Sequence, residues 1–184
     1  MPRALLAILH LPERLAHKSR RKRLEARLSR ARAPRSILFV CHGNLYRSPY
    51  AAAALTHMLR FRQSPLRVMS AGFRGPDRPT PPEAVTEART RDVDLSDHRS
   101  QLVTHALIDD ASWIFVMNAS QRDAIATLRG NAVRRVFVLG DLDPERIETR
   151  EIVDPQGSGV KTLKRCYDRI DRCLEEVARL AFRG

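Results

Sequence analysis

A cysteine and an arginine separated by five residues, Cys41 and Arg47, are the side chains of this sequence best suited to chemistry. They follow the short apolar run 37–40 and precede a stretch of helical character, 49–62. Five residues wrapped between a strand end and a helix start can turn their backbone N–H groups inward, and the helix N-terminus adds a partial positive charge. This spacing predicts a cradle for an anion.

The residue types in this segment fit phosphoryl transfer. Inward N–H dipoles and a neighbouring guanidinium favour the thiolate form of Cys41, which would act as nucleophile. The planar fork of Arg47 matches two oxygens of a phosphate, and the Ser48 hydroxyl can donate to the sulfur. Gly43 and Asn44 suit the positive φ angles that such a turn requires. The structural alternative is a buried strand-end cysteine and an arginine that caps a surface.

Phosphoryl transfer to a thiolate also requires a proton for the leaving oxygen, which a carboxylic acid on a loop can supply. Two aspartates that precede prolines, Asp143 and Asp154, are candidates. Glycines at 157 and 159 allow the second loop to fold over a pocket, which favours Asp154. The alternative is that both aspartates are ordinary turn residues.

Strand-like and helix-like segments alternate along the chain and would position these residues. Short apolar runs predict strands, and longer stretches with a helical period predict helices. The expected strands are 37–40, 67–70, 113–117 and 134–139, and the expected helices are 49–62, 82–90, 119–128 and 160–182. This alternation indicates an α/β fold with a parallel sheet, whose functional crevice lies beyond the carboxyl ends of the strands.

The positive charge of the chain is concentrated in an N-terminal arm. The 184 residues carry a net charge of +12, and residues 1–36 hold eleven basic residues against two acidic ones. The stretch 12–33 has helical composition with a thin apolar stripe, so we expect a helix that is not deeply buried. The predicted organisation is a basic helical extension, residues 1–35, followed by one domain, residues 36–184.

Composition excludes several classes of protein. With 43% apolar and 29% charged residues, the chain is neither disordered nor of low complexity. No apolar run approaches the ~20 residues that span a bilayer, and the run 4–11 is a poor signal-peptide core. Cys41, Cys166 and Cys173 form neither a disulfide framework nor a metal-binding pattern. We expect a soluble cytoplasmic protein.

The arm has four open interpretations: a contact with anionic lipid, a contact with nucleic acid, a cleaved organelle-targeting peptide, or a solvated helix. No aromatic residue lies among the bases to stack on nucleobases, so nucleic acid is disfavoured. An anionic membrane surface is the favoured partner, with the protein peripheral to the membrane.

Several segments resemble the low-molecular-weight protein tyrosine phosphatases. The stretch VCHGNLYRSPYAAAAL around Cys41 resembles the phosphate-binding loop of that family. Similar segments follow in the family's order at 70–72 (SAG), 94–100 (DLSDHRS), 116–118 (VMN), 138–140 (VLG) and 152–155 (IVDP). The likeness covers roughly Ser36 to Leu180 and leaves the arm outside.

The resemblance implies a Rossmann-like, four-stranded parallel sheet with helices on both faces. It implies hydrolysis of phosphorylated proteins or small aryl phosphates through a cysteinyl phosphate, without a metal or organic cofactor. Cys41 would be the nucleophile, Arg47 the phosphate clamp and Asp154 the general acid and then base. The substrate-binding residues would be His42, Gly43, Asn44, Leu45, Tyr46 and Ser48.

The sequence departs from the family pattern around the pocket. Tyr46 stands where the family usually has a second cysteine, so a neighbouring thiol cannot protect the nucleophile. Gln156 and Gly157 follow the acid in place of aromatic residues that sandwich a phosphotyrosine ring. His42 alters the pocket rim, and Tyr46 or Tyr50 is available as an aromatic wall. The phosphoresidue specificity is therefore open.

Three other functions are compatible with the same sequence features. An arsenate reductase of this fold would relay a disulfide through Cys166 and Cys173, whose helical spacing is typical of core packing. Arginine phosphatases have a loop that resembles C-T-G-N-T-C-R. That pattern has threonine at the position of Leu45. A phosphate-binding adaptor would keep the loop without turnover.

Overall fold

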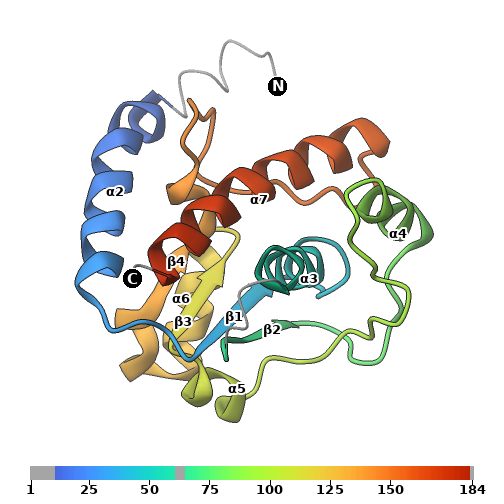
Figure 1. Cartoon of the computed structure of the whole chain (residues 1–184), viewed down its shortest axis with the longest axis horizontal. Coiled ribbons are helices and arrows are strands. Elements are labelled where there is room, and N and C mark those ends of the chain that lie inside the picture. The colour runs from blue at the N-terminus through green and yellow to red at the C-terminus, as the bar shows by residue number, and fades with distance from the viewer. Residues whose placement is uncertain (1–10, 61–64, 183–184) are drawn as a thin grey trace.

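Within residues 11–60 and 65–182, which the computed structural model describes, a four-stranded and entirely parallel sheet forms the centre of the molecule. Its strands are β1 (Ser36–Cys41), β2 (Arg67–Gly72), β3 (Trp113–Val116) and β4 (Val136–Val138), in the spatial order β2-β1-β3-β4. Parallel neighbours require crossover connections, and each connection between successive strands contains at least one helix (Figure 1).

Helices cover both faces of this sheet (Figure 1). One face carries α3 (Arg47–Leu59), α4 (Pro82–Arg89) and α7 (Val160–Ala181), and the other carries α5 (His105–Asp110) and α6 (Ala119–Leu128). The 3₁₀ helices η2 (Gly130–Arg135) and η3 (Leu139–Leu142) flank β4, and α2 (Leu11–Arg30) packs beside α7 and η3. The α/β architecture expected from the sequence is thus confirmed.

Alternate side chains of the strands supply two separate cores. On β1, Ile37, Phe39 and Cys41 face α3, α4 and α7, whereas Leu38 and Val40 face α5 and α6. All residues of β1 are buried. The central strand is therefore apolar on both faces, as expected for a sheet covered on two sides, and Cys41 lies on the α3 side.

The end of β1 is the point at which the strand order reverses. After β1 the chain crosses to β2 on one side, and β3 and β4 add on the other side. A crevice opens at such a point, beyond the carboxyl ends of the strands. The loop that follows Cys41 occupies this position.

Element boundaries differ from the sequence prediction where local hydrogen bonding competes with the strand pattern. The expected strand 134–139 is confined to β4, because Arg135 belongs to η2 and donates to carbonyl oxygens in and after α5. The sequence does not predict α5, a single short helix whose N-cap Thr104 accepts a hydrogen bond from the backbone N–H of Leu107.

The arm helix ends earlier than predicted. α2 stops at Arg30 rather than at Ala33, because a residue that precedes a proline disfavours the helical conformation and the chain must turn into β1. Neither α2 nor any other helix in the described part of the chain has the length and apolar character to cross a bilayer.

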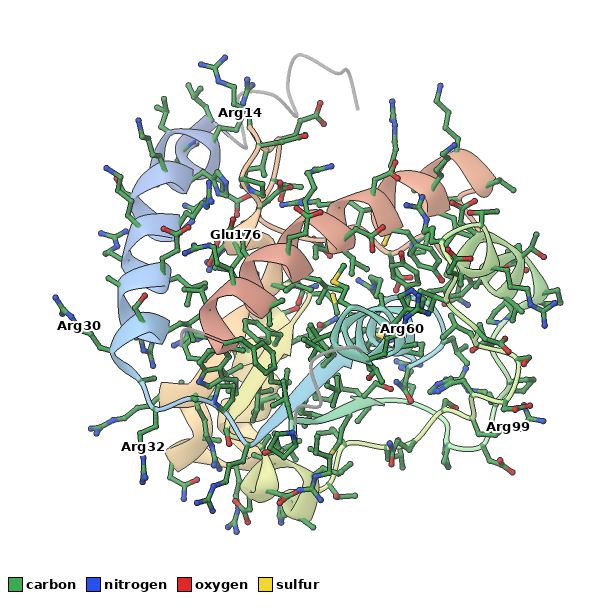
Figure 2. The ribbon with its side chains drawn as sticks, in the orientation of Figure 1. Arg14, Arg30, Arg32, Arg60, Arg99 and Glu176 are labelled. Atoms are coloured by element: carbon green, nitrogen blue, oxygen red, sulfur yellow. The ribbon has the colours of Figure 1, made fainter. Side chains whose placement is uncertain are left out.

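α2 lies against the body along one side, and most of its residues remain exposed or partly exposed. Leu28 is only 1% exposed and joins the core on the α7 side of the sheet. Arg21 pairs with Glu176 of α7, and the guanidinium of Arg27 lies 5.0 Å from the ring centroid of Phe137. Figure 2 labels Glu176 on α7. The expectation that this helix is not deeply buried agrees with the structure, since His17 and Leu28 are its buried residues. Its thin apolar stripe does not, however, reveal the acidic and aromatic partners that α7 and β4 bring to it.

Leu28→Ala should destabilise the protein, because it leaves a cavity where α2 meets the body. Truncation of a buried leucine costs about 2–5 kcal/mol of unfolding free energy. The control is Leu15→Ala on the same helix, since Leu15 is 74% exposed and its loss should change stability by less than about 0.5 kcal/mol. Urea unfolding measures both, and equal stabilities would contradict the packing of α2.

Candidate active site

The candidate nucleophile lies at the floor of a loop that leads directly from β1 into α3. The Cys41 side chain is buried, and its Sγ accepts hydrogen bonds from the backbone N–H of Asn44 at 3.2 Å and from the Ser48 hydroxyl at 3.0 Å. Because α3 begins at Arg47, the positive end of its dipole points at the same loop. These donors stabilise negative charge on the sulfur.

Asn44 holds the loop in its turned conformation. Its φ of 52° lies in the left-handed region, as predicted. Its side-chain amide donates to the hydroxyls of Ser48 and Ser70 at 2.9 Å each, and its Oδ1 accepts from the backbone N–H of Gln101 at 2.9 Å. Gly43 does not adopt a positive φ, so the turn needs only one left-handed residue where two were expected.

Two side chains outside the loop hold its carbonyl groups. His98 Nε2 lies 2.9 Å from the carbonyl oxygen of Asn44, and Arg78 donates to the carbonyl oxygens of Gly43 and Gly75 at 3.0 Å each. Burial lowers the pKa of His98 below its ordinary value of 6.5, against the opposing effect of the bond to Asn44, so the ring is neutral at neutral pH. No local pattern marks Arg78 as a residue of the site, whereas His98 lies in the DLSDHRS segment that resembles the family.

The guanidinium of Arg47 connects the loop after β1 to the loop that carries Asp154. Its side chain is 3% exposed, Nη1 donates to the carbonyl oxygen of Ile152 at 3.0 Å, and Nη2 pairs with the carboxylate of Asp154. Nε is buried and has no hydrogen-bond partner among the residues that the structure describes. A buried cation with an unmet donor is stabilised by an anion, and the pocket beside Cys41 is where that anion would lie.

The two candidate acids occupy different environments. Asp154 is 37% exposed and lines the same pocket as Arg47. Asp143 is 1% exposed and accepts from the Nε atoms of Arg169 and Arg172 on α7 at 3.0 Å each. Asp143 is therefore held in buried ion pairs with α7, and the geometry favours Asp154 as the proton donor.

The wall of the pocket combines apolar and polar side chains. Leu45 and Tyr46 line it from the loop, and Gln156, which sequence analysis treats only as a departure from the family, lines it from the acid side. Burial and the hydrogen bond from the Tyr46 hydroxyl to Glu83, at 2.6 Å, raise the pKa of this phenol, so Tyr46 stays neutral. His42 is exposed at the start of the loop.

Tyr50 is a core residue and does not form part of the pocket wall. It is fully buried, and its ring stacks on that of Tyr167 with centroids 3.7 Å apart. Its hydroxyl donates to Asp171 at 2.6 Å. Of the two tyrosines considered from the sequence, only Tyr46 reaches the pocket.

The remaining cysteines do not offer a disulfide relay. Both lie buried on α7, where burial raises the pKa of the Cys166 thiol to about 12 and also raises the pKa of Cys173. Thiol exchange needs a thiolate, which this environment disfavours. Across residues 11–60 and 65–182, no group of three or more His, Cys, Asp or Glu side chains is arranged to hold a metal ion.

Gly72, at the end of β2, allows the phosphate-binding loop to lie directly against the sheet. A Cβ atom on Gly72 would lie 2.7 Å from the backbone nitrogen of Asn44 and 2.9 Å from the carbonyl carbon of Gly43. Both contacts are with backbone, which cannot swing aside as a side-chain tip can. Any residue larger than glycine at this position would therefore require the loop to move.

Sequence comparisons find similar proteins. A profile of the family described as low molecular weight phosphotyrosine protein phosphatase matches residues 36–181. The probable low molecular weight protein-tyrosine-phosphatase EpsP of Ralstonia nicotianae is 32% identical over 142 residues, covering 77% of this chain and 92% of EpsP. The protein-arginine-phosphatase of Bacillus subtilis is 28% identical over 144 residues, covering 78% of this chain and 94% of that protein.

A solved structure shows the same fold with a modified nucleophile position. It is a cysteine-to-serine mutant of the arginine phosphatase YwlE with a phosphorylated active-site serine, and it is 26% identical to this chain with a TM-score of 0.71. The match covers 78% of this chain and 93% of that structure. The family profile starts at β1 and leaves α2 outside.

Gly72→Ala should weaken the binding of inorganic phosphate by about tenfold or more, because a displaced loop loses at least one charge-assisted hydrogen bond of about 1.5 kcal/mol. The matched control is Gly130→Ala, where an added Cβ meets nothing within 4 Å. Isothermal titration of both variants measures the difference. Unchanged affinity in Gly72→Ala would show that the loop tolerates the shift.

Proposed function

The chain belongs to the low-molecular-weight phosphotyrosine protein phosphatase family, and we propose that it hydrolyses phosphotyrosine in proteins with Cys41, Arg47 and Asp154 as catalytic residues. The observation that carries this proposal is the buried guanidinium of Arg47, whose Nε has no partner in the described part of the chain. It lies in the same pocket as the Cys41 sulfur, which accepts two hydrogen bonds. A phosphate dianion would satisfy that guanidinium through two oxygens.

In the first step, the phosphate lies in the loop and its non-bridging oxygens accept from backbone N–H groups and from Arg47. Sγ of Cys41 attacks phosphorus, and the bond from phosphorus to the phenolic oxygen breaks. Asp154 in its protonated form gives its proton to that oxygen, so tyrosine leaves as a neutral phenol. The hold of Arg47 strengthens as negative charge spreads over the equatorial oxygens.

In the second step, water releases the phosphate. Asp154, now a carboxylate, takes a proton from water while the water oxygen attacks phosphorus. The S–P bond breaks, and Cys41 leaves as a thiolate that the Ser48 hydroxyl and the Asn44 N–H stabilise. The products are inorganic phosphate and free enzyme, and no other reactant is consumed.

Leu45 favours an aryl phosphate over phosphoarginine. Its side chain is nearly buried in the pocket wall, where it offers apolar contact to a ring and no hydrogen bond to a guanidinium. The relatives include both activities, since EpsP is named a tyrosine phosphatase and the Bacillus subtilis relative an arginine phosphatase. We propose phosphotyrosine as the substrate because the pocket wall is apolar at Leu45.

We further propose that the outer face of α2 contacts an anionic membrane surface. Arg14 and Arg30 project away from the body (Figure 2), and Lys18 and Lys22 are exposed on the same helix. Leu15, near the start of α2, is the most exposed of the large apolar side chains described. Exposed cations beside apolar side chains suit a peripheral contact with anionic headgroups.

Charge reversal on α2 should weaken membrane binding. Lys18→Glu/Lys22→Glu should lower cosedimentation with phosphatidylserine vesicles by about tenfold or more, since each cation near such a surface contributes about 1 kcal/mol. Lys161→Glu/Lys164→Glu makes the same charge change at exposed positions of α7 and should bind like wild type. Equal binding by all three proteins, or tighter binding to duplex DNA, would contradict the proposal.

Cys41→Ser should abolish the hydrolysis of p-nitrophenyl phosphate and still bind inorganic phosphate, because the loop N–H groups and Arg47 remain. Arg47→Lys should lose most activity as well, because a point charge cannot hold two oxygens as the planar fork does. Steady-state kinetics and phosphate titration measure both variants. Turnover by Cys41→Ser would exclude the cysteinyl-phosphate mechanism.

Wild-type enzyme should hydrolyse a phosphotyrosine peptide with a kcat/KM at least about tenfold above that of the matched phosphoarginine peptide. Leu45→Thr should lower the ratio of the two kcat/KM values in favour of phosphoarginine, because it places a hydroxyl in the pocket wall. Phosphate release from the two peptides gives the ratio. A wild-type preference for phosphoarginine would overturn the substrate assignment and leave the role of Cys41 intact.

A further inference from the structure

We propose that α2, which lies outside the family match, positions the catalytic acid: Glu13, His17 and Arg20 hold the segment 141–152 that leads directly to Asp154. This inference rests on the proposed role of Asp154. On this proposal the basic arm contributes to the active site. Glu13, His17 and Arg20 are positioning residues, which act through the segment that leads to Asp154.

The three side chains contact the segment at successive points. The Glu13 carboxylate accepts from the Thr149 hydroxyl at 2.9 Å and from the backbone N–H of Arg150 at 3.2 Å. His17 Nε2 lies 2.9 Å from the carbonyl oxygen of Asp143. Arg20 Nε donates to the carboxylate of Asp141 at 3.2 Å.

These contacts are buried or partly buried. His17 and Asp141 are buried, and Arg20 shares the Asp141 carboxylate with Arg150, whose Nη2 lies 2.6 Å from it. Hydrogen bonds and ion pairs at buried sites are costly to break, because the group left behind stays without a partner. The helix therefore restrains the segment more strongly than a surface contact would.

The opposite side of the segment is held by α7. Arg169 pairs with Asp143 and donates to the carbonyl oxygens of Thr149 at 2.9 Å and Glu151 at 2.6 Å. In Figure 1 the segment, in orange, runs between α2 and α7. It is thus held from both sides.

The end of the segment enters the active site directly. The backbone N–H of Ile152 donates to the carbonyl oxygen of Met117 at 2.9 Å, and the carbonyl oxygen of Ile152 accepts from Arg47. Asp154 follows two residues later and pairs with the same guanidinium. A shift of the segment at Thr149 would therefore reach the carboxyl group within a few residues of extended chain.

Packing alone does not fix the segment. A cavity of about 270 Å³ opens between it and α7, lined among others by Ile147, Ile152, Thr162 and Cys166. Where close packing is missing, polar contacts decide the position of the backbone. Removal of the Glu13 and His17 contacts should let the segment move into or away from this space.

The experiment compares leaving groups that differ in their need for a proton. Glu13→Ala/His17→Ala should lower kcat/KM for phenyl phosphate by about tenfold or more and change kcat/KM for p-nitrophenyl phosphate by less than about threefold, because only the poorer leaving group depends on the acid. The matched control is Ser19→Ala/Arg23→Ala, two exposed positions one turn apart on the same helix. It should behave like wild type with both substrates.

A double-mutant cycle separates positioning from general destabilisation. Asp154→Asn should show the same leaving-group dependence more strongly, and adding Glu13→Ala/His17→Ala to it should change the substrate ratio no further, since the acid is already gone. If the double α2 variant fails to fold, Glu13→Gln, which keeps the volume and weakens the acceptor, should show a smaller loss confined to phenyl phosphate.

Two results would overturn the proposal. An equal loss with both substrates, or an unchanged substrate ratio in folded Glu13→Ala/His17→Ala, would mean that α2 only stabilises the fold. Failure of the proposed function would look different: Asp154→Asn would show no leaving-group dependence, or Cys41→Ser would retain turnover, whatever the α2 variants do.

Discussion

The structure depends on one buried cation. Arg47 joins two segments more than a hundred residues apart in the chain, the loop after β1 and the loop before α7, and its side chain is almost inaccessible to solvent. Burial of a guanidinium is unfavourable unless each donor finds a partner. The carbonyl oxygen of Ile152 and the carboxylate of Asp154 meet part of that need, and Nε is left for an anion. The same interaction therefore joins two distant parts of the fold and shapes the candidate binding site.

The loop around this cation is rigid because several layers of hydrogen bonds fix it. Asn44 takes the left-handed conformation and bonds to three neighbours, and His98 and Arg78 hold carbonyl groups on the outside. Outward carbonyls keep the adjoining N–H groups directed inward. Gly72 lets the whole loop lie against β2. Preorganised donors of this kind need no rearrangement when charge develops on a phosphate.

The arm shows how charge composition can be misread. Its many bases indicate a solvated helix, but one side of the helix meets the body, where His17 and Leu28 are buried. On that inner side Arg20 and Arg21 pair with acidic residues from η3 and α7, and Glu13 accepts from the segment that precedes the acid. The outer side keeps its free cations. One helix thus combines an inner face that packs beside the active site with an outer face suited to an anionic surface.

The sequence by itself determined the α/β fold, the parallel order of elements and the segment in which the site lies. These follow from local features: hydrophobic period, the spacing of Cys41 and Arg47, and an Asp-Pro loop near the last helix. Local sequence pattern does not decide which of Asp143 and Asp154 lies in the pocket. It also does not show that Tyr46 lines the pocket while Tyr50 packs in the core, or that Arg78 contacts the loop. Each of those depends on which distant residues meet. Tertiary structure alone shows the surroundings of these residues, because an ion pair such as that of Asp143 with α7, or the packing of α2, has no signature in neighbouring sequence.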